Sequence, residues 1–441
     1  MPTLTLRSLT TTLCLYSVVA ASSHAAGLSR DGATARSLAL GGTSTADARN
    51  PLDAMASNPA TMANLDRATL DLNADVGFIH GTFDNRANDH VGLHENGFIG
   101  SGAIVIPFGT IRLGFGIDPQ MAMRDRWRYR DTPGGANGIT TYGVRPQSSE
   151  IILLRSALGL SWQPVPQFSI GASVGLLYNK NELQAPYVFQ SQPVLRGVKT
   201  LLDLDTDGYG CNVQAGMLWT PLKALQIGVS YTSQSKIVTN GRATGNADVQ
   251  LANLGLGAAR SDFAYDAEVT NVFPQQVSFG IAVHATSKLT LSTQLDWINW
   301  ANSFDTLEVR LRNGNNKDLN GLVRSDRLDD DVPLDWRDQF VIRAGIEYTL
   351  GEHWTLRAGY SYGRNPVPSA TLTPLTAAIM EHTVSAGFGY KRGRYGVDLA
   401  YEWQIPNSVG ISDSALASGE YSDSSIRVSA QTIGLTATVE F

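Results

Sequence analysis

The sequence predicts an all-β fold, a transmembrane antiparallel β-barrel of about 14 strands with a small N-terminal helical hatch. Three observations lead to it: an export signal, no long apolar run after that signal, and strands of alternating polarity that continue to the terminal Phe441. Without a run of about 18 apolar residues, the chain can cross a membrane only as a closed sheet. The net charge of -6 gives no electrostatic reason to expect a nucleic-acid partner.

The first element is a secretory signal peptide in residues 1–25. Arg7 precedes the apolar stretch 9–21, and residues 23–25 supply the small side chains that signal peptidase requires. We expect cleavage after Ala25 or one residue later, followed by export to the periplasm. The remaining chain then holds a single cysteine, Cys211, so we expect no internal disulfide.

The second element, residues 26–66, lacks strand alternation. Its side chains are small and polar, with short helical patches such as 53–63. From Arg67 onward, segments of period 2 continue to the C-terminus. We therefore expect a hatch domain over 26–66 and a barrel over 67–441.

The barrel segments carry apolar residues on one face and small, polar or charged residues on the other. In the last segment, Leu435, Val439 and Phe441 share the apolar face, which suits lipid outside and a polar lumen inside. Strands are expected near residues 74, 103, 114, 157, 173, 214, 231, 279, 294, 343, 358, 387, 400 and 435. Short links alternate with long ones, which predicts short periplasmic turns and long external loops. The long links span residues 84–96, 119–148, 180–207, 238–272, 305–334, 364–380 and 406–427.

A soluble β-sandwich or propeller is the alternative fold with the same alternation. Such a fold would direct its charged residues outward to water, whereas here they share a face with glycine, serine and threonine. The opposite face holds leucine, valine, isoleucine and aromatic residues without interruption. The pattern therefore favours the membrane barrel.

Two regions resemble the FadL family of outer-membrane transporters for long-chain fatty acids and aromatic hydrocarbons. The first is Asn58-Pro59-Ala60 before the first strand, which is similar to the motif of that family's N-terminal hatch. The second is an ordered series of blocks between Leu295 and Tyr401. The resemblance implies a hatch that closes the lumen, passive uptake of a hydrophobic small molecule without a cofactor, and lateral release into the membrane.

The same resemblance implies a place and a set of partners. We expect a monomer in the Gram-negative outer membrane, in contact with membrane lipid and lipopolysaccharide. Phe441, the last residue of the last strand, resembles the terminal signal read by the barrel-assembly machinery.

Two predicted external loops are rich in apolar side chains, which a hydrophobic ligand needs for its first contact. In the family, such loops form a capture groove; alternatively, they pack on each other and cap the barrel. The candidate capture residues are Leu183, Tyr187, Val188, Phe189, Leu195, Leu251, Leu254 and Phe263.

A ligand carboxylate would need a cationic partner, because a charge-assisted hydrogen bond offsets part of the cost of burying it. The candidates are Arg155 and Arg343 on the lumen face and Arg196 and Lys199 in the first capture loop. The alternative is that luminal arginines pair with inward-facing carboxylates such as Asp296 in a network within the wall.

The third strand offers a candidate lateral gate. Gly114 and Gly116 precede Pro119, and a proline in a strand removes a hydrogen-bond donor and favours a bulge or a strand end. In the family, a kink in this strand opens a lateral exit. The alternative is that the strand simply ends at its external loop.

The hatch motif also has two interpretations. Asn58 can hydrogen-bond backbone groups in a turn and Pro59 fixes its own φ, so Asn58-Pro59-Ala60 could lock the hatch in one conformation. In the second interpretation, ligand binding shifts the hatch and connects the pocket with the exit.

Enzymatic function is not expected, and neither is a metal or a cofactor. The sequence lacks Cys-x-x-Cys and His-Glu-x-x-His, and its 7 histidines are scattered. Two other functions stay open: a surface adhesin or receptor-like structural barrel whose long loops bind a partner, and a general porin for polar solutes. A porin would have an open lumen, which distinguishes it from a barrel closed by a hatch.

Overall fold

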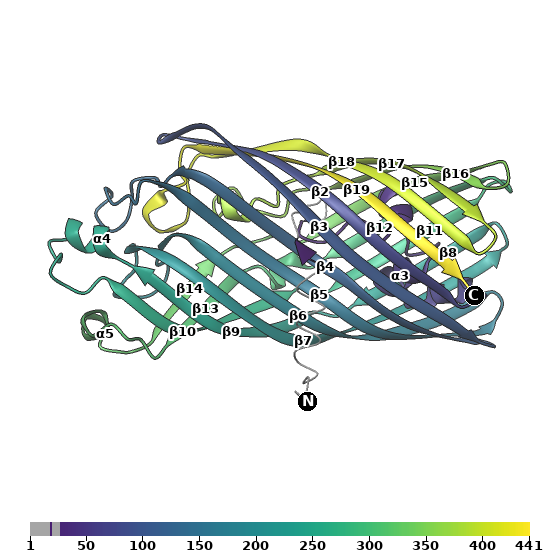
Figure 1. Ribbon diagram of the computed structural model, residues 1–441, viewed down its shortest axis with the longest axis horizontal. Helices are drawn as coiled ribbons and strands as arrows, with labels where there is room; N and C mark the ends of the chain where they lie inside the picture. The colour runs from purple at the N-terminus through teal and green to yellow at the C-terminus, as the bar shows by residue number, and fades with distance from the viewer. Residues whose placement is uncertain (1–17, 20–26) are drawn as a thin grey trace, which may run out of the picture.

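The computed structural model describes residues 18–19 and 27–441, so the predicted cleavage site lies outside the described residues. The main feature is a closed antiparallel barrel of 14 strands (Figure 1). The barrel strands are β2 (Thr69–Asn85), β3 (Asn88–Phe108), β4 (Ile111–Arg130), β5 (Val144–Val165), β6 (Phe168–Val188), β7 (Lys199–Leu222), β8 (Leu225–Thr232), β11 (Gln276–His284), β12 (Leu289–Ile298), β15 (Gln339–Leu350), β16 (Trp354–Gly363), β17 (His382–Arg392), β18 (Tyr395–Ile411) and β19 (Ser424–Glu440). The expected strand centres all lie in these strands, and the predicted fold class is confirmed.

The barrel closes between its last and first strands. The pairs of β19 with β2 run from Ser425↔Asp84 to Glu440↔Thr69. A further two-residue strand, β1 (Val18–Val19), lies within the predicted signal peptide and pairs with β3.

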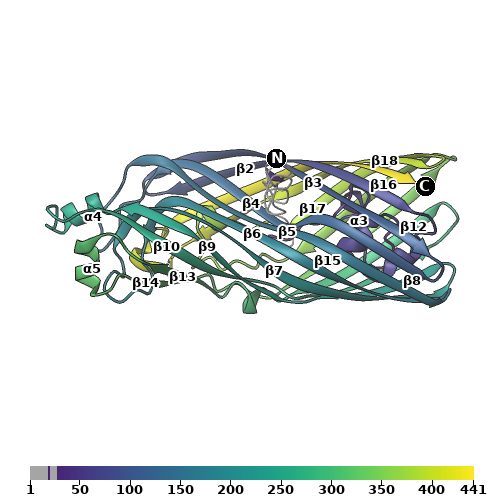
Figure 2. The same cartoon turned by 60° about the horizontal axis from the view of Figure 1, so that its bottom comes forward.

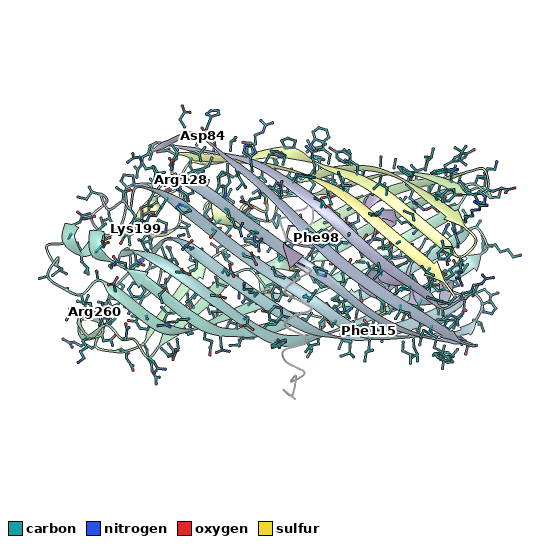
Figure 3. All side chains as sticks on the ribbon, in the orientation of Figure 1. Asp84, Phe98, Phe115, Arg128, Lys199 and Arg260 are labelled. Atoms are coloured by element: carbon teal, nitrogen blue, oxygen red, sulfur yellow. The ribbon has the colours of Figure 1, made fainter. Side chains whose placement is uncertain are left out.

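The outer wall carries the apolar face that the alternation predicts. Leu72, Leu158 and Phe340 are each more than half exposed, and Phe98 and Phe115 are labelled on the wall in Figure 3. Exposed apolar side chains in a continuous band are typical of a lipid-facing surface. No helix in the described residues is long and apolar enough to span a membrane.

The predicted external loops are shorter than expected, because the strands continue into them. β4 runs on to Arg130, and β6 and β7 together leave only residues 189–198 as a loop. Two further hairpins extend the wall near β7, formed by β9 (Ser235–Asn246), β10 (Asp262–Phe273), β13 (Thr306–Arg312) and β14 (Leu328–Pro333), with the helices α4 (Asp248–Asn253) and α5 (Lys317–Val323). The strand extensions carry charged outward residues, such as Arg128 of β4 (Figure 3) and Asp205 of β7, and exposed polar or charged residues of the hairpins include Asn240 and Arg242 of β9. By sequence, a segment is predicted as a strand only when one of its faces is apolar. These strand extensions and hairpins are therefore not identified from the sequence.

The hatch segment lies inside the barrel, where Figures 1 and 2 show α3 enclosed by strands. It contains α2 (Ala35–Ala39), α3 (Pro51–Ser57) and the 3-10 helix η1 (Pro59–Asn64). Thr34 forms a capping box at the start of α2. Prolines stand in the first turn of α3 and of η1, where a backbone N–H would have no partner within the helix. Three more 3-10 turns lie in the connections: η2 (Trp300–Asn302), η3 (Pro374–Thr376) and η4 (Ala417–Gly419).

Candidate functional site

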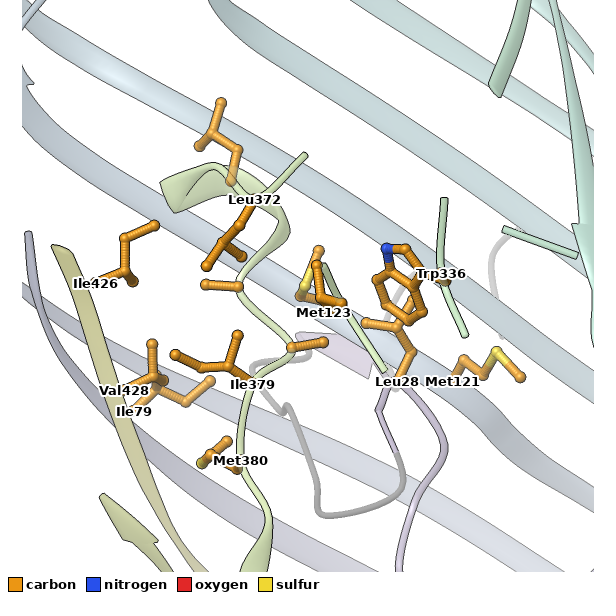
Figure 4. Close-up of a cluster of buried hydrophobic side chains, with 14 of the residues drawn as sticks. Leu28, Ile79, Met121, Met123, Trp336, Leu372, Ile379, Met380, Ile426 and Val428 are labelled. Atoms are coloured by element: carbon orange, nitrogen blue, oxygen red, sulfur yellow. The ribbon is translucent and has the colours of Figure 1, made fainter. Parts of the chain in front are cut away.

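An apolar cavity of about 260 Å³ lies beneath the external loops. Its walls come from the upper parts of β5 and β6, from the two outer hairpins, and from the connections that contain η3 and η4. Leu28, Met123 and Trp336 contribute to the cavity and also belong to the large buried cluster drawn in Figure 4. The cavity is thus continuous with the hydrophobic core above the hatch.

Four of the candidate capture residues line this cavity, namely Leu183, Tyr187, Val188 and Phe189. Leu195 and Phe263 are buried in an adjoining cluster that packs the loops against the outer hairpins. Leu251 and Leu254 do not line the cavity. Leu251 lies in α4, and Leu254 is the C-cap of that helix, with 42% of its surface exposed. The structure thus brings the first predicted loop to the cavity but not these two residues of the second.

Lys199 ties three external loops together above the cavity. Its side chain is fully buried, and its Nζ lies 2.6 Å from Asp131 Oδ1 and 3.0 Å from Glu420 Oε2. It also donates a hydrogen bond of 2.8 Å to the carbonyl of Thr132. Lys199 therefore pairs with protein carboxylates rather than standing ready for a ligand. Arg196, the other cation predicted in this loop, has an exposed side chain.

The cap around Lys199 should weaken as the pH rises. Burial raises the pKa of Glu420 from 4.5 to about 7, although Lys199 opposes the shift. At a pH between these two values, Glu420 is ionised when its loop is detached from the barrel and protonated when the loop is packed. The packed loop therefore becomes less stable, relative to the detached loop, as the pH rises from about 4.5 to about 7. Hydrogen exchange in residues 412–423, corrected for intrinsic rates, should be faster at about pH 8 than at about pH 5. The Glu420→Gln variant should reduce this difference, with the remainder due to Asp131, whose pKa burial also raises. An equal difference in the variant would refute the assignment.

A second, polar pocket of about 120 Å³ lies deeper in the lumen, beside the hatch. Arg343 reaches into it from β15 and holds two buried carboxylates, Asp31 of the hatch segment at 2.6 Å and Asp296 of β12 at 2.7 Å. Arg30 pairs with Asp118 at 2.6 Å and with Asp75. Both arginines therefore act as clamps between the hatch segment and the wall, and Arg343 is not available as the predicted carboxylate partner.

Arg155 has neutral partners instead. It donates hydrogen bonds to Asn212 Oδ1 (2.8 Å), to Ser173 Oγ (2.7 Å) and to the carbonyl of Met55 in α3 (3.3 Å). Ser173 is the centre of a Gly-Ala-Ser-Val-Gly sequence, residues 171–175, which has the spacing of a hydrolase nucleophile elbow. The segment lies in the middle of β6 with unbroken pairing to β5 and β7, so it does not form the strand-to-helix turn that such an elbow requires.

Asn58 fixes the hatch both to itself and to the wall. Its Oδ1 accepts a hydrogen bond from the Ala60 amide (3.0 Å), and its Nδ2 donates to the carbonyls of Thr45 (2.8 Å) and Met217 (3.0 Å). Gly216 permits this approach, since a Cβ there would lie 1.9 Å from Asn58 Oδ1. These contacts agree with the locking interpretation of the motif.

The candidate gate glycines lie in regular pairing. Gly114 and Gly116 pair with β3 on one side and β5 on the other, so the irregularity does not lie there. Their role is close packing: a Cβ on Gly114 would approach the Met55 and Met62 sulfurs of the hatch to 2.5 and 2.7 Å.

The irregularity in β4 lies instead at Pro119. There the register with β5 shifts between Pro119 and Met121, and β4 continues to its external end rather than stopping. The ladder between β3 and β4 ends at Gly102↔Ile117. The two strands meet again at Asn88, whose side chain hydrogen-bonds the backbone of Arg130 at 2.8 and 2.9 Å. Between these points the described residues form no β3–β4 ladder, and β3 pairs instead with the short strand β1 at Phe98 and Ile99. We call this segment the β3–β4 slit.

The hatch segment contacts the inner side of this slit. Ser29 forms an isolated bridge with Met121, and the Arg30 amide donates to the carbonyl of Gln120 at 3.4 Å. The sequence does not mark Arg30, because only its contacts in the folded chain, with Asp118 and with the carbonyl of Gln120, connect it with the kink. No motif marks such a contact between distant segments.

A closed β-barrel with a helical hatch in its lumen, an apolar cavity under its loops and a slit in its wall defines a plugged membrane channel. The chain belongs to the outer membrane protein transport protein family (OMPP1/FadL/TodX), whose model matches residues 16–441. Its members are outer-membrane channels for hydrophobic compounds.

Several solved structures share this fold. A FadL homologue from Pseudomonas aeruginosa matches with a TM-score of 0.78 at 17% identity, over 94% of this chain and 100% of that one. The Pseudomonas putida toluene transporter TodX matches with a TM-score of 0.74 at 19% identity, over 94% and 99%. The Ralstonia pickettii toluene transporter TbuX matches with a TM-score of 0.71 at 20% identity, over 93% and 99%. No curated protein matches the sequence.

Proposed function

We propose that this protein takes up hydrophobic compounds passively, by capture in the apolar cavity, passage beside the hatch and lateral release through the β3–β4 slit. The observation that carries the proposal is the order of these features along one short segment. Leu28 lines the apolar cavity, Ser29 and Arg30 line the polar pocket, and the same two residues contact β4 at the slit. A ligand that displaces this segment would connect all three.

The slit is the feature that a lateral route needs. Ile99 of β3 and Ala122 of β4 pack against each other across it, and the described residues form no β3–β4 ladder there. Separating apolar side chains costs less than breaking a ladder inside a membrane, where unpaired backbone groups cost several kcal/mol each. The two strands can therefore part at this place more readily than at their paired ends.

Blocking the slit should stop uptake while leaving capture intact. The Ala122→Trp variant adds a large apolar side chain to a fully buried position on β4. We expect toluene uptake into cells to fall by at least about tenfold, with unchanged toluene binding by the purified protein. Ala358→Trp, on the exposed outer face of β16, is the control with the same change in size. Uptake that stays normal in a folded Ala122→Trp variant would refute lateral release.

The alternative of a general porin is less favoured, because the hatch and its arginine clamps occupy the lumen. Contact with lipopolysaccharide, recognition of Phe441 by the assembly machinery, the removed signal peptide and the monomeric state stay predictions.

A further inference from the structure

We infer that the apolar cavity selects uncharged molecules, such as substituted aromatic hydrocarbons, over fatty-acid anions. This inference rests on the proposed uptake of hydrophobic compounds and narrows it to one class. It follows from four features of the residues around the cavity: their charge, their shape, the partners of the nearby cations and one unpaired amide.

The cavity lining contains no lysine, arginine or histidine among the residues that the structure describes. Its charged members are all acids, Glu150, Glu182, Asp330 and Glu420. Each already has partners: Glu150 pairs with Arg124, Glu182 with Lys180, and Glu420 with Lys199. A ligand carboxylate would therefore be buried beside other carboxylates, and burial of an unpaired charge is strongly unfavourable.

Asp330 is held by donors from the protein. Its carboxylate accepts hydrogen bonds from the backbone amides of Gln190 (2.9 Å), Ser191 (2.6 Å) and Gln192 (3.0 Å) and from the Tyr187 hydroxyl. These three amides form a cluster of donors suited to bind an anion, and one of them, that of Gln190, belongs to the lining. Because Asp330 occupies them, they offer no place to a ligand carboxylate.

The shape and the aromatic content of the lining suit a ring. Five aromatic side chains contribute to it: Tyr187, Phe189, Phe304, Trp336 and Tyr421. A protein cavity of about 150 Å³ is large enough to bind benzene. The volume of about 260 Å³ here therefore accommodates a benzene ring with an alkyl substituent, and offset or edge contacts between rings favour such a ligand.

The cations deeper along the route are also engaged. Arg30 and Arg343, which line the polar pocket, each bind two carboxylates. Arg155 lines neither pocket and donates to a hatch carbonyl and to two neutral side chains. A ligand anion would have to break one of these arrangements before it found a positive charge.

One neutral polar group in the lining is unsatisfied. Asn271 of β10 is 5% exposed and lines the cavity, and its Nδ2 has no hydrogen-bond partner among the described residues. A buried amide donor without a partner costs free energy, so a ligand with an acceptor can gain by reaching it. Asn271 thus provides an orienting contact for a neutral ligand and a position at which the charge of the lining can be changed.

The test compares two probes with the same hydrophobic body, n-butylbenzene and 4-butylbenzoate, at neutral pH. Binding to the purified full-length protein is followed by Trp336 fluorescence or calorimetry, and folding is checked by the shift in gel mobility of the unheated barrel. We expect butylbenzene to bind at least about tenfold more tightly than butylbenzoate, because the carboxylate has no cation in the cavity. Equal or tighter binding of butylbenzoate would overturn the inference and leave the uptake function standing. Failure of both probes to bind would count against the proposed function itself.

A gain-of-function variant keeps the test independent of loss of folding. Asn271→Lys places a cation in the lining, and we expect it to raise butylbenzoate binding by at least about tenfold while weakening butylbenzene binding. Asn271→Leu, the uncharged control of similar volume, should leave the preference for butylbenzene unchanged. If Asn271→Lys folds and does not improve butylbenzoate binding, the lack of a cation is not what excludes the anion, and the inference fails.

Discussion

Replacing Arg343 by methionine should free the hatch from the barrel wall and turn a closed barrel into a conducting one. The substitution removes the guanidinium that Asp31 and Asp296 share, and both carboxylate side chains are almost completely buried. Removing one partner of a buried ion pair typically costs about 3–5 kcal/mol, since an uncompensated charge stays behind. Asp31 belongs to the hatch segment and Asp296 to β12 of the wall. Movement of the hatch separates the two carboxylates and hydrates them, so we expect the hatch to move.

The measurement is single-channel conductance in planar bilayers, together with hydrogen exchange in residues 27–66. Arg312→Met is the matched control, because Arg312 pairs with Asp329 on an outer hairpin where both side chains are about a third or more exposed. Such a pair contributes at most about 1 kcal/mol, and its loss should not change conductance. Combining Arg343→Met with Asp31→Asn and Asp296→Asn should close the barrel again by removing the two buried negative charges that Arg343 balances. An Arg343→Met barrel as closed as the unaltered protein would refute the clamp.

The strands of the barrel could be predicted from sequence because lipid imposes a local rule. Every second residue must be apolar along a spanning segment, and this rule can be read without knowing the partner strand. The same rule fails above the membrane, where Arg128 and Asp205 face water and the strands of the external wall carry no apolar outer face. The hatch could be located for the opposite reason, since residues 26–66 lack the alternation.

The pairings within the site could not be predicted in this way. Arg343 is a candidate ligand partner by sequence, with a wall network that includes Asp296 as the alternative; its two partners, residues 31 and 296, meet only in the folded barrel. The sequence places the glycines of the third strand in a candidate lateral gate, whereas in the structure they make room for Met55 of the hatch. In both cases the residue type was informative, and the missing information was which distant side chain lies opposite.

Asn58→Ala should loosen the hatch without opening the barrel fully. The substitution removes the acceptor for the Ala60 amide and the donor to the Thr45 and Met217 carbonyls, all in a buried place. Leaving buried backbone groups unpaired costs about 1–3 kcal/mol, less than the loss of Arg343. We expect faster hydrogen exchange over residues 45–64, and a higher rate of toluene uptake because the hatch opens more often.

Asn316→Ala is the control for this prediction, because Asn316 caps α5 in the same manner but far from the hatch. Its Oδ1 accepts from the amides of Asp318 and Leu319 at 3.0 Å each, and its Nδ2 donates to two backbone carbonyls. The control should speed exchange in α5 alone and leave uptake unchanged. Unchanged hatch exchange in Asn58→Ala would show that the motif does not lock the hatch. Faster hatch exchange with unaltered uptake would confirm that Asn58 locks the hatch but exclude hatch opening as the step that limits transport. The limiting step would then lie at the β3–β4 slit.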